Sequence, residues 1–411
     1  MSSIAPSHGR SLSTWKFLTG ELRPKGRLLT PFNIITGAII LTAAVLLTIR
    51  FAQGLGAVSN VNQDFPWGVW KGFNVVSGVA LAGGAYVLTF MVYILGLEKY
   101  KPIVRVTVLN GFLAYVFYAG ALVLDLGRPW KIMNPIIGNS FGFTSVLFLV
   151  AWHFLLYMTA ELIEFSPAIA EWLGKERARK ILKGMAVGAV VMGISLSTLH
   201  QSGLGALFLM AKPKIHPLWY SEFIPLLFFI SSIFAGLAMV IFEGSISHHV
   251  FRDRVGDQLR RSHDLILVGL ARICGVVMFV YLFLQSLNFM HGQLWHELHG
   301  FYGALYLTEI VGLVALPMIL FLRGAACRDT TTVRVASVLC LLGVILNRLN
   351  ISVICYKWYE TKHYVPSWME LVIMVAVVCA EIWVFRWVVR RLPVLAPASE
   401  DSPTLANARS N

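Results

Sequence analysis

The sequence predicts an all-α integral membrane protein with about ten transmembrane helices. Hydrophobic residues make up 57% of its 411 residues and charged residues only 13%, and a soluble domain of this length would not tolerate so much apolar surface. The apolar residues gather into runs of about 20, a length that crosses a hydrocarbon core of about 30 Å. Basic residues recur in every second connection between these runs, as they do in multi-pass membrane proteins.

Ten segments are long and apolar enough to be the predicted helices, and the connections between them are too short for a soluble domain. They cover residues 31–51, 68–97, 103–125, 141–163, 179–199, 221–243, 265–289, 301–322, 333–356 and 367–389. We therefore expect a polar N-terminal tail over residues 1–30, a ten-helix membrane domain over 31–391 and a polar C-terminal tail over 392–411.

The formal net charge of +13 would suggest nucleic acid in a soluble protein, but its distribution excludes that partner here. Lys and Arg concentrate in the N-terminal tail, near residues 99–105, 175–183, 252–261 and 323–334, and at 386–391. The intervening connections hold few of them. By the positive-inside rule, both termini are expected in the cytoplasm and the base-poor connections on the outer side. The basic clusters can bind lipid head groups.

Cysteine and histidine usage argues against a metal centre. The five cysteines are scattered without a C-x-x-C motif, so iron-sulfur ligation and covalent haem attachment lack their usual sequences. Bis-histidine haem needs paired transmembrane histidines, yet only His153 lies at mid-depth and His200 lies at the outer end of its predicted helix. We expect no metal, haem or iron-sulfur cluster bound by this chain.

Aromatic residues and one cation open the second predicted helix. Trp67 and Trp70 fit an ordinary aromatic belt at the membrane interface. Lys71, however, lies just inside the apolar run, where a cation needs a carboxylate, a carbonyl or a ligand oxygen as its partner. Both interpretations remain open on the residues alone.

The third and fourth predicted helices carry ionisable groups. Asp125 ends the third helix and either pairs with Arg128 or exchanges protons with a bound ligand. His153 lies mid-membrane in the fourth helix, with Glu161 near its inner end. A solitary histidine there is more often a hydrogen-bonded interior residue than a ligand.

The connection after the fifth predicted helix has an unusual composition. His200, Gln201 and Ser202 begin a glycine-containing stretch over residues 200–210, and a second aromatic stretch follows over 216–221. Histidine, amide, hydroxyl and aromatic groups together are more than a spacer needs. The stretch over residues 65–67 and that over 216–219 each start an inward-running helix, four helices apart. This predicts parallel repeats, with four-helix bundles from helices two to five and six to nine, flanked by helices one and ten.

The second half places more charges at depth. Counting about 1.5 Å per residue, Glu309 and Arg348 lie at one depth. Arg272 and Glu381 lie at another. Buried charges in a membrane must pair, so two ion pairs are one interpretation. The other is a ladder of polar groups that carries protons.

Four motifs resemble the NrfD/PsrC family, the membrane subunits of polysulfide reductase and related complexes. They occupy residues 65–70, 200–205, 216–219 and 241–245, and the similarity is greatest to members that accompany a periplasm-facing nickel-iron hydrogenase. The hydrogenase-type members carry an acidic residue in helix four where this chain has Leu149, and His153 one turn on could replace it. The resemblance implies a haem-free subunit of the bacterial inner membrane. Such a subunit passes electrons between a periplasmic, ferredoxin-like iron-sulfur partner and menaquinone or another quinone near the outer face. It also implies a further catalytic or cytochrome c subunit.

These observations define one candidate site and one candidate path. The expected catalytic residues are Asp125 and His200, and the expected quinone-binding residues are Trp67, Trp70, Lys71, Arg128, Gln201 and Ser202. The expected proton path comprises His153, Glu161, Arg272, Glu309, Arg348 and Glu381. A secondary transporter and a b-type cytochrome subunit are the alternative functions. The aromatic, histidine-rich outer connections argue against the first, and the missing histidine pair argues against the second.

Overall fold

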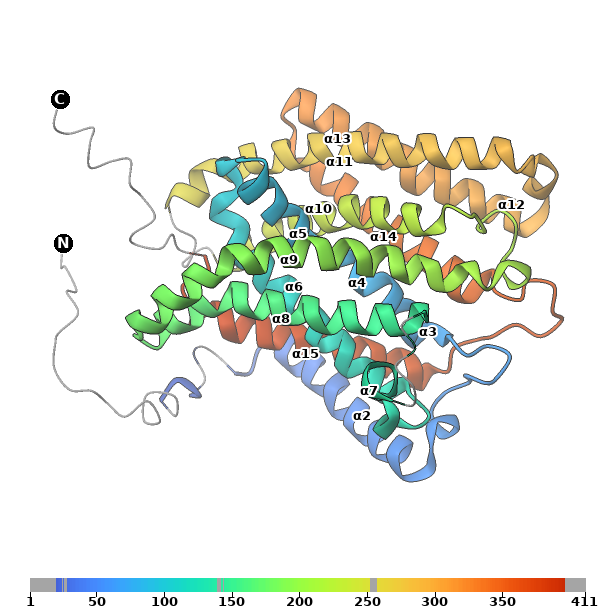
Figure 1. The fold of residues 1–411 in the computed structure, drawn as a ribbon, viewed down its shortest axis with the longest axis horizontal. Helices are drawn as coiled ribbons and strands as arrows, with labels where there is room; N and C mark the ends of the chain where they lie inside the picture. The colour runs from blue at the N-terminus through green and yellow to red at the C-terminus, as the bar shows by residue number, and fades with distance from the viewer. Residues whose placement is uncertain are drawn as a thin grey trace.

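Ten long helices run side by side in the computed structural model, which describes residues 20–23, 25, 28–138, 142, 144–251 and 257–395 (Figure 1). The predicted all-α fold with ten membrane-spanning helices is therefore confirmed. The spans are Pro31–Gln53, Gly68–Ile94, Glu98–Asp125, Val146–Trp172, Glu176–Leu209, Ile224–Val250, Ser262–His291, Gly300–Cys327, Thr330–Ile354 and Trp368–Val389. Most of both predicted tails, residues 1–19 and 396–411, lies outside the described residues, as does the basic connection at 252–256.

Six of the ten spans are each formed by one α-helix. These are α2 (Pro31–Gln53), α8 (Val146–Trp172), α9 (Glu176–Leu209), α10 (Ile224–Val250), α11 (Asp257–His291) and α15 (Trp368–Val389). The third span joins the 3₁₀ turn η4 (Glu98–Tyr100) to α6 (Lys101–Asp125). Prolines at the first turns of α2, α6 and α10 suit those positions because no backbone donor is needed there.

The other three spans contain π-helical segments, in which the backbone turn is wider than in an α-helix. The second span is α3 (Gly68–Trp70), η2 (Lys71–Gly78), α4 (Val79–Leu81), α5 (Gly84–Thr89) and η3 (Phe90–Ile94). The eighth is α12 (Gly300–Leu307), η8 (Thr308–Ala315) and α13 (Leu316–Cys327), and the ninth is α14 (Thr330–Leu349) and η9 (Asn350–Ile354). The segments η2, η3, η8 and η9 are π-helical.

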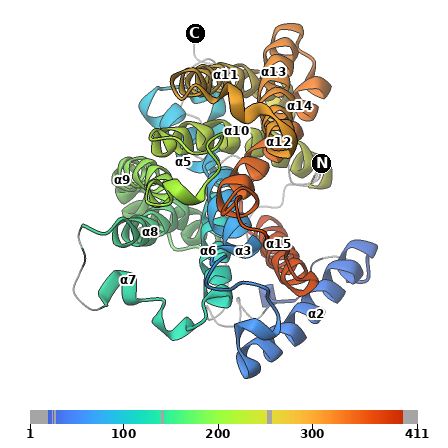
Figure 2. The same ribbon diagram turned by 90° about the vertical axis from the view of Figure 1, so that its right-hand side faces the viewer.

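Short helical turns form the connections. They are η1 (Leu55–Ala57), η5 (Pro129–Lys131), α7 (Asn134–Ile137), η6 (Lys212–Lys214) and η7 (Leu294–Leu298). Within the described ranges the structure has no β-strand, only one isolated bridge between Ile215 and Tyr356. We call the end of the molecule that carries these five turns the outer end. It lies at the right of Figure 1 and faces the viewer in Figure 2.

Helix α10 lies at the centre and packs against α5, α9, α11 and α14. Its contact with α5 is a close backbone crossing, because a Cβ atom on Gly236 would meet the backbone of Gly84. Small residues allow such an approach, and van der Waals contact then holds the two helices together.

Helices α2 and α15, the first and last spans, pack against each other at one side of the molecule (Figure 2). Trp383 Nε1 donates a hydrogen bond to Thr36 Oγ1 at 2.9 Å, and the Trp383 ring also covers Gly37. Helix α15 in turn packs against α6. The division of the other eight spans into two four-helix bundles stays an interpretation.

Several helix ends differ from the predicted ones, most clearly in α8 and α9. Helix α8 begins and ends later than the predicted 141–163, and Pro167 lies inside it. Helix α9 continues through His200 to Leu209 instead of ending at 199. His200 and Gln201 remain helical because their polar groups bond to carbonyls of neighbouring helices, as described below.

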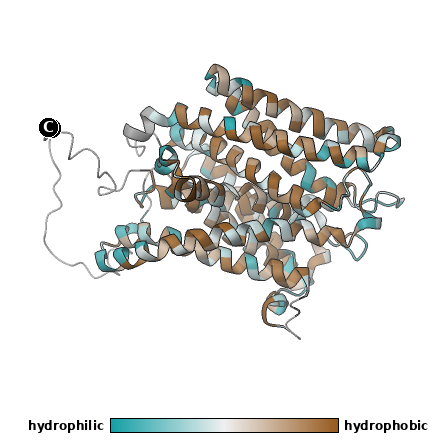
Figure 3. Cartoon of the chain, turned by 45° about the horizontal axis from the view of Figure 1, so that its top comes forward, coloured by the Kyte–Doolittle hydropathy of each residue, from teal (hydrophilic) through white to brown (hydrophobic). Residues whose placement is uncertain are grey.

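The surface between the two ends is apolar. Figure 3 shows hydrophobic residues along the outward faces of the helices and hydrophilic residues gathered at their ends. Met192 on α9 is 53% exposed and Phe279 on α11 is 58% exposed. Such a surface suits lipid rather than water. The chain is therefore a multi-pass membrane protein.

Candidate functional site

Three π-helical segments place polar residues near the outer end. Lys71 begins η2, Glu309 is the second residue of η8, and Asn350 begins η9. A π-helical turn costs regular hydrogen-bond geometry and is found frequently at functional sites. The segments η2 and η9 also pack together, with Gly72 directly against Ser352.

Lys71 pairs with Asp125. Its Nζ lies 3.1 Å from Asp125 Oδ2 and donates a hydrogen bond to the Pro66 carbonyl at 2.8 Å. The Asp125 side chain is 1% exposed and the Lys71 side chain 20%. Apart from this ion pair, neither carboxylate oxygen of Asp125 accepts a hydrogen bond from a described residue. Arg128 is exposed, so the ion pair that Asp125 makes is with Lys71 and not with Arg128.

Arg50 brings a second cation to the same place. It is 3% exposed, its Nε donates to the Leu124 carbonyl at 2.8 Å, and its guanidinium also bonds to the Leu126 carbonyl. These carbonyls close the C-terminus of α6, where helices leave acceptors unsatisfied and favour positive charge. Arg50 therefore fixes the helix end that presents Asp125. The sequence analysis missed it, although a lone arginine inside the first apolar run is a usable signal.

Glu370 anchors the aromatic side of this site. Its side chain completes the capping box of α15 with Ser367. The Glu370 carboxylate also accepts hydrogen bonds from the backbone N–H of Asn60, at 2.7 Å, and from the Tyr364 hydroxyl. Its own carbonyl accepts from Trp70 Nε1 at 2.6 Å. The Ser-x-x-Glu spacing before an apolar run is the sequence signal that could have located it. We call Arg50, Trp70, Lys71, Asp125, Tyr364 and Glu370 the outer cluster.

The residues of the His200 stretch lie deeper than the outer cluster. His200 is 1% exposed, and its Nδ1 lies 3.1 Å from the Val150 carbonyl. Its ring packs against Tyr115 at 5.9 Å between centroids. Tyr115 precedes Asp125 by ten residues on α6, which is about 15 Å along the helix. The structure therefore does not bring the two predicted catalytic residues into contact.

The other predicted quinone-binding residues also lie at two different depths. The Trp67 ring packs against Phe208, 5.0 Å away, near the outer end. Gln201 Nε2 donates to the Val79 carbonyl at 2.8 Å, which ties α9 to the second span. Ser202 is half-buried beside Gln201. Only Trp70 and Lys71 of the predicted binding residues belong to the outer cluster with Asp125.

A second set of buried polar groups lies between α6, α8 and α9. Glu161 is 2% exposed, and neither of its carboxyl oxygens makes a hydrogen bond at ordinary distance within the described ranges. It interacts with Tyr157, whose ring packs against Tyr115 at 4.6 Å. His153 is half-buried on the same helix. These groups follow the α8 and α9 interface inward from His200.

Glu309 and Arg348 do not form the predicted direct ion pair. The Glu309 carboxylate accepts hydrogen bonds from three side chains: Trp219 Nε1 at 2.7 Å, Asn347 Nδ2 at 2.7 Å and Asn350 Nδ2 at 2.6 Å. Arg348 donates to Asn347 Oδ1 and Ser231 Oγ, and its guanidinium lies 3.4 Å from the centroid of the Phe228 ring. Asn347 therefore bridges the two charges. The two charged groups lie near each other, but each makes its hydrogen bonds to neighbouring polar side chains and not to the other.

Arg272 and Glu381 are not partners either. Arg272 is exposed, whereas Glu381 is 9% exposed. Gly275, less than one turn from Arg272, packs against Leu322 near the inner end of α13. Arg272 thus lies on the surface, level with the inner part of α13. Glu381 interacts instead with Tyr118 and Glu243.

His216 has a structural role in the outer connection. Its backbone amide donates to the Cys355 carbonyl at 3.0 Å, and its ring packs between Trp219, Tyr302 and Trp358. Burial lowers its pKa below the ordinary value, and Glu297, 3.7 Å away, opposes part of that shift. No group of three His, Cys, Asp or Glu residues suited to a metal occurs in the part of the chain that the structure describes.

Residues 57–358 match the family model described as polysulphide reductase, NrfD. The match includes all four motifs singled out from the sequence. It also includes Lys71, Asp125 and Glu309, but not Arg50 or Glu370.

The chain is similar to three proteins over nearly its whole length. A protein of Nitratidesulfovibrio vulgaris is 41% identical, with 90% of this chain and 95% of the relative covered. The probable Ni/Fe-hydrogenase 2 b-type cytochrome subunit of Escherichia coli is 29% identical, covering 92% and 95%. The menaquinone reductase integral membrane subunit of Nitratidesulfovibrio vulgaris is 26% identical, covering 85% and 88%.

Proposed function

This chain belongs to the polysulphide reductase NrfD family, and from that membership we propose that it is the quinone-reactive membrane subunit of a respiratory oxidoreductase. It exchanges electrons between a periplasmic, ferredoxin-like iron-sulfur partner and menaquinone or another quinone near the outer face. A catalytic or cytochrome c subunit completes the complex. The names of the two relatives, a menaquinone reductase subunit and a hydrogenase subunit, support a role of this class.

The observation that carries the proposal is the Lys71–Asp125 pair. A quinone takes up two electrons and two protons to become a quinol, so its site needs a donor to the carbonyl oxygen and a group that exchanges protons. Lys71 Nζ is partly exposed and can donate, whereas the Asp125 carboxylate keeps two oxygens free of other hydrogen bonds. The pair thus offers both functions within 3.1 Å.

The neighbours of this pair hold it in place. Arg50 fixes the end of α6, and the Glu370 carbonyl fixes the Trp70 ring beside Lys71. We assign the acid-base role to Asp125. His200, about 15 Å deeper, is assigned a positioning role through its contact with Val150 on α8. Trp67 and Arg128 lie at the outer end, and Gln201 and Ser202 lie beside His200.

A b-type cytochrome is the second candidate, because one relative carries that word in its name. His153 and His200 lie close enough to interact, but His200 Nδ1 already faces the Val150 carbonyl. We expect no stoichiometric b-haem in the reduced-minus-oxidised spectrum of the purified protein. Such a spectrum would favour the cytochrome function over the haem-free one.

Substitution of Asp125 tests the proposal directly. We expect Asp125→Asn to leave the complex assembled and to lower quinone-linked turnover by about 10²-fold or more, the usual scale for a lost acid-base group. Activity of the partner with a soluble dye should survive, because dye reduction bypasses the membrane subunit. Asp64→Asn is the matched control, since Asp64 is an exposed acid at the same end.

His200→Ala on the same preparation separates the two assigned roles. A positioning role predicts a smaller loss of turnover than Asp125→Asn, recovered in part by His200→Gln, which keeps a hydrogen-bonding group at that position. Wild-type quinone turnover in Asp125→Asn would show that the acid-base group lies elsewhere, and the Glu309 network would be the next place to look.

A further inference from the structure

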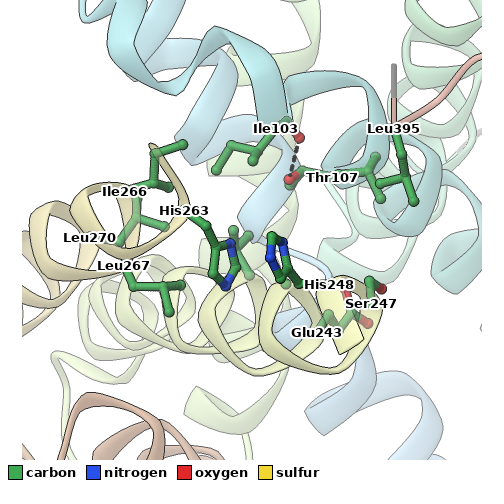
Figure 4. Close-up of a pocket in the computed structure, with 13 residues that line it drawn as sticks. Ile103, Thr107, Glu243, Ser247, His248, His263, Ile266, Leu267, Leu270 and Leu395 are labelled. Carbon is green, nitrogen blue, oxygen red and sulfur yellow. Dashed lines mark hydrogen bonds between the residues drawn. The ribbon is translucent and has the colours of Figure 1, made fainter. Parts of the chain in front are cut away.

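Helix α11 has two different faces toward the inner end of the molecule. One face, which includes His263, Ile266, Leu267 and Leu270, points into the molecule and lines a cavity between α11, α6 and α10 (Figure 4). The opposite face is exposed and carries Arg272. Residues three or four positions apart are neighbours on a helix surface. The exposed residues that follow Arg272 at this spacing therefore belong to one continuous surface.

The part of α11 outward of Arg272 is long enough to cross a membrane by itself. His291, the last residue of α11, lies about 28 Å further along the helix at about 1.5 Å per residue. This length is close to the roughly 30 Å hydrocarbon core of a bilayer. The membrane segment of α11 therefore need not extend inward past Arg272.

Arg323 on α13 lies at nearly the same level as Arg272. The antiparallel helices α11 and α13 pack against each other at the edge of the molecule (Figure 2), and Gly275 contacts Leu322 where they meet. Arg272 lies about 4.5 Å inward of Gly275, and Arg323 lies about 1.5 Å inward of Leu322. The two arginines are therefore on neighbouring helices at levels about 3 Å apart.

Neither arginine forms an ion pair within the described ranges of the chain. Both side chains are exposed, and neither makes a hydrogen bond to a described residue. Asp329 lies close enough to interact with Arg323, but it is itself exposed and accepts hydrogen bonds from the Thr331 and Thr332 amides at the start of α14. Two neighbouring cations thus form a positive surface that an external anion can neutralise.

An apolar stripe continues outward from the two arginines. On α11 it consists of Val276, Phe279 and Phe283, each more than half exposed and each three or four residues from the last. Ile319, also more than half exposed, adds to it from α13. From Arg272 to Phe283 the stripe is about 16 Å long, roughly the half of the hydrocarbon core that one leaflet provides. A charged end and an apolar body of this length match one lipid molecule.

We propose that Arg272 and Arg323 bind the phosphate of an anionic phospholipid and that the apolar stripe holds one of its acyl chains. A guanidinium group donates two parallel N–H bonds to a phosphate, which favours arginine at such sites. A zwitterionic lipid carries its own ammonium group near the phosphate, and that group would repel the second arginine. The site therefore selects a phosphatidylglycerol-type head group. The bound lipid joins α11 to α13 at the opposite end of the molecule from the outer cluster.

Native mass spectrometry of the purified full-length protein in detergent measures this binding. The probe is phosphatidylglycerol, and phosphatidylcholine with the same acyl chains is the control lipid. Wild type should bind phosphatidylglycerol more tightly. Arg272→Gln and Arg323→Gln should each weaken its binding about 5-fold, the scale of one basic residue beside an anionic lipid. Arg177→Gln, which removes an exposed arginine at the inner end of α9, should bind as wild type.

Thermal unfolding with added lipid shows that the variants are folded. A ligand that binds only the folded state raises the melting temperature, so phosphatidylglycerol should stabilise wild type and Arg177→Gln more than the Arg272→Gln/Arg323→Gln double variant. Glycerol phosphate, which has the phosphate without acyl chains, should not displace the lipid. Equal phosphatidylglycerol affinity of wild type and the double variant would overturn the proposal. So would equal wild-type affinity for the two lipids, or complete displacement by glycerol phosphate.

Discussion

At the scale of single residues, buried acids differ in how completely their oxygens are bonded. Glu309 accepts three hydrogen bonds from Trp219, Asn347 and Asn350, so both of its carboxyl oxygens are already bonded. Asp125 has one ion pair and no other bond from the described chain. An acid that exchanges protons with a ligand needs oxygens that are not already committed. This difference is why we propose Asp125, and not Glu309, as the acid of the quinone site.

His216 gives a prediction on pH. Its folded-state pKa lies below the ordinary value of 6.5 because the ring is buried. Protonation therefore disfavours the folded state, so its contribution is complete above that value and is lost as pH falls through the folded pKa. We expect the melting temperature to fall as pH decreases below about 6.5. The slope should be smaller in His216→Gln. His299→Gln, an exposed histidine nearby, should keep the wild-type slope.

Residue types at depth could be predicted from the sequence, but their partners could not. A cation inside an apolar run needs an oxygen partner, and in the structure Lys71 forms an ion pair with Asp125. The position of a residue along a helix does not show which way its side chain points. Glu309 and Arg348 were expected to pair because they lie at one depth, but they make no direct contact. Arg272 was predicted as a buried charge at depth, but its side chain is exposed, which its position along the helix could not show.

At the scale of elements, helix number and type followed from the apolar runs, whereas helix ends and π-helical segments did not. Helix α9 continues through His200 and Gln201 because the carbonyls of Val150 and Val79 accept hydrogen bonds from their side chains. A π-helical turn leaves no pattern of residue types as clear as the 3.6-residue period. The segments η2, η8 and η9 still share one property, since each carries a polar residue within an apolar span.

The crossing of α10 and α5 gives a prediction on packing. A Cβ atom on Gly236 would meet the backbone of Gly84, which no side-chain movement relieves. We expect Gly236→Ala to destabilise the protein by about 1–3 kcal/mol, the usual range for overpacking. Thermal unfolding in detergent measures this. Gly188→Ala on α9 is the control, because its Cβ would meet open space, and it should be neutral or slightly stabilising. Equal stability of the two variants would contradict the packing argument.

At the scale of the whole molecule, the distribution of basic residues sets the orientation. The connections at the inner end hold most of the Lys and Arg, as the positive-inside rule requires of a cytoplasmic side. The structure fixes which connections share an end, and the rule alone assigns that end to a compartment. The location of both termini therefore remains a prediction.

Reporter fusions test the orientation. Fusions at His216 and Trp295 should report a periplasmic location, and fusions at Lys175 and Arg328 a cytoplasmic one, because charge asymmetry orients short loops. The two pairs lie at opposite ends of the molecule. Reversed signals would invert the fold in the membrane and place Asp125 on the cytoplasmic side. Residue 254, another basic-loop position, lies outside the described residues.

The contact between the first and last spans has a consequence for biogenesis. Trp70 and Asn60 both form hydrogen bonds with Glu370, and α2 packs against α15. The N-terminal residues of the outer cluster can therefore make these contacts only after Glu370 and α15 have left the ribosome. Until then Trp70 Nε1 lacks its acceptor. A nascent chain stalled before α15 would lack the Glu370 contacts of Asn60 and Trp70. The proposed quinone site is therefore completed only after Glu370 has been synthesised.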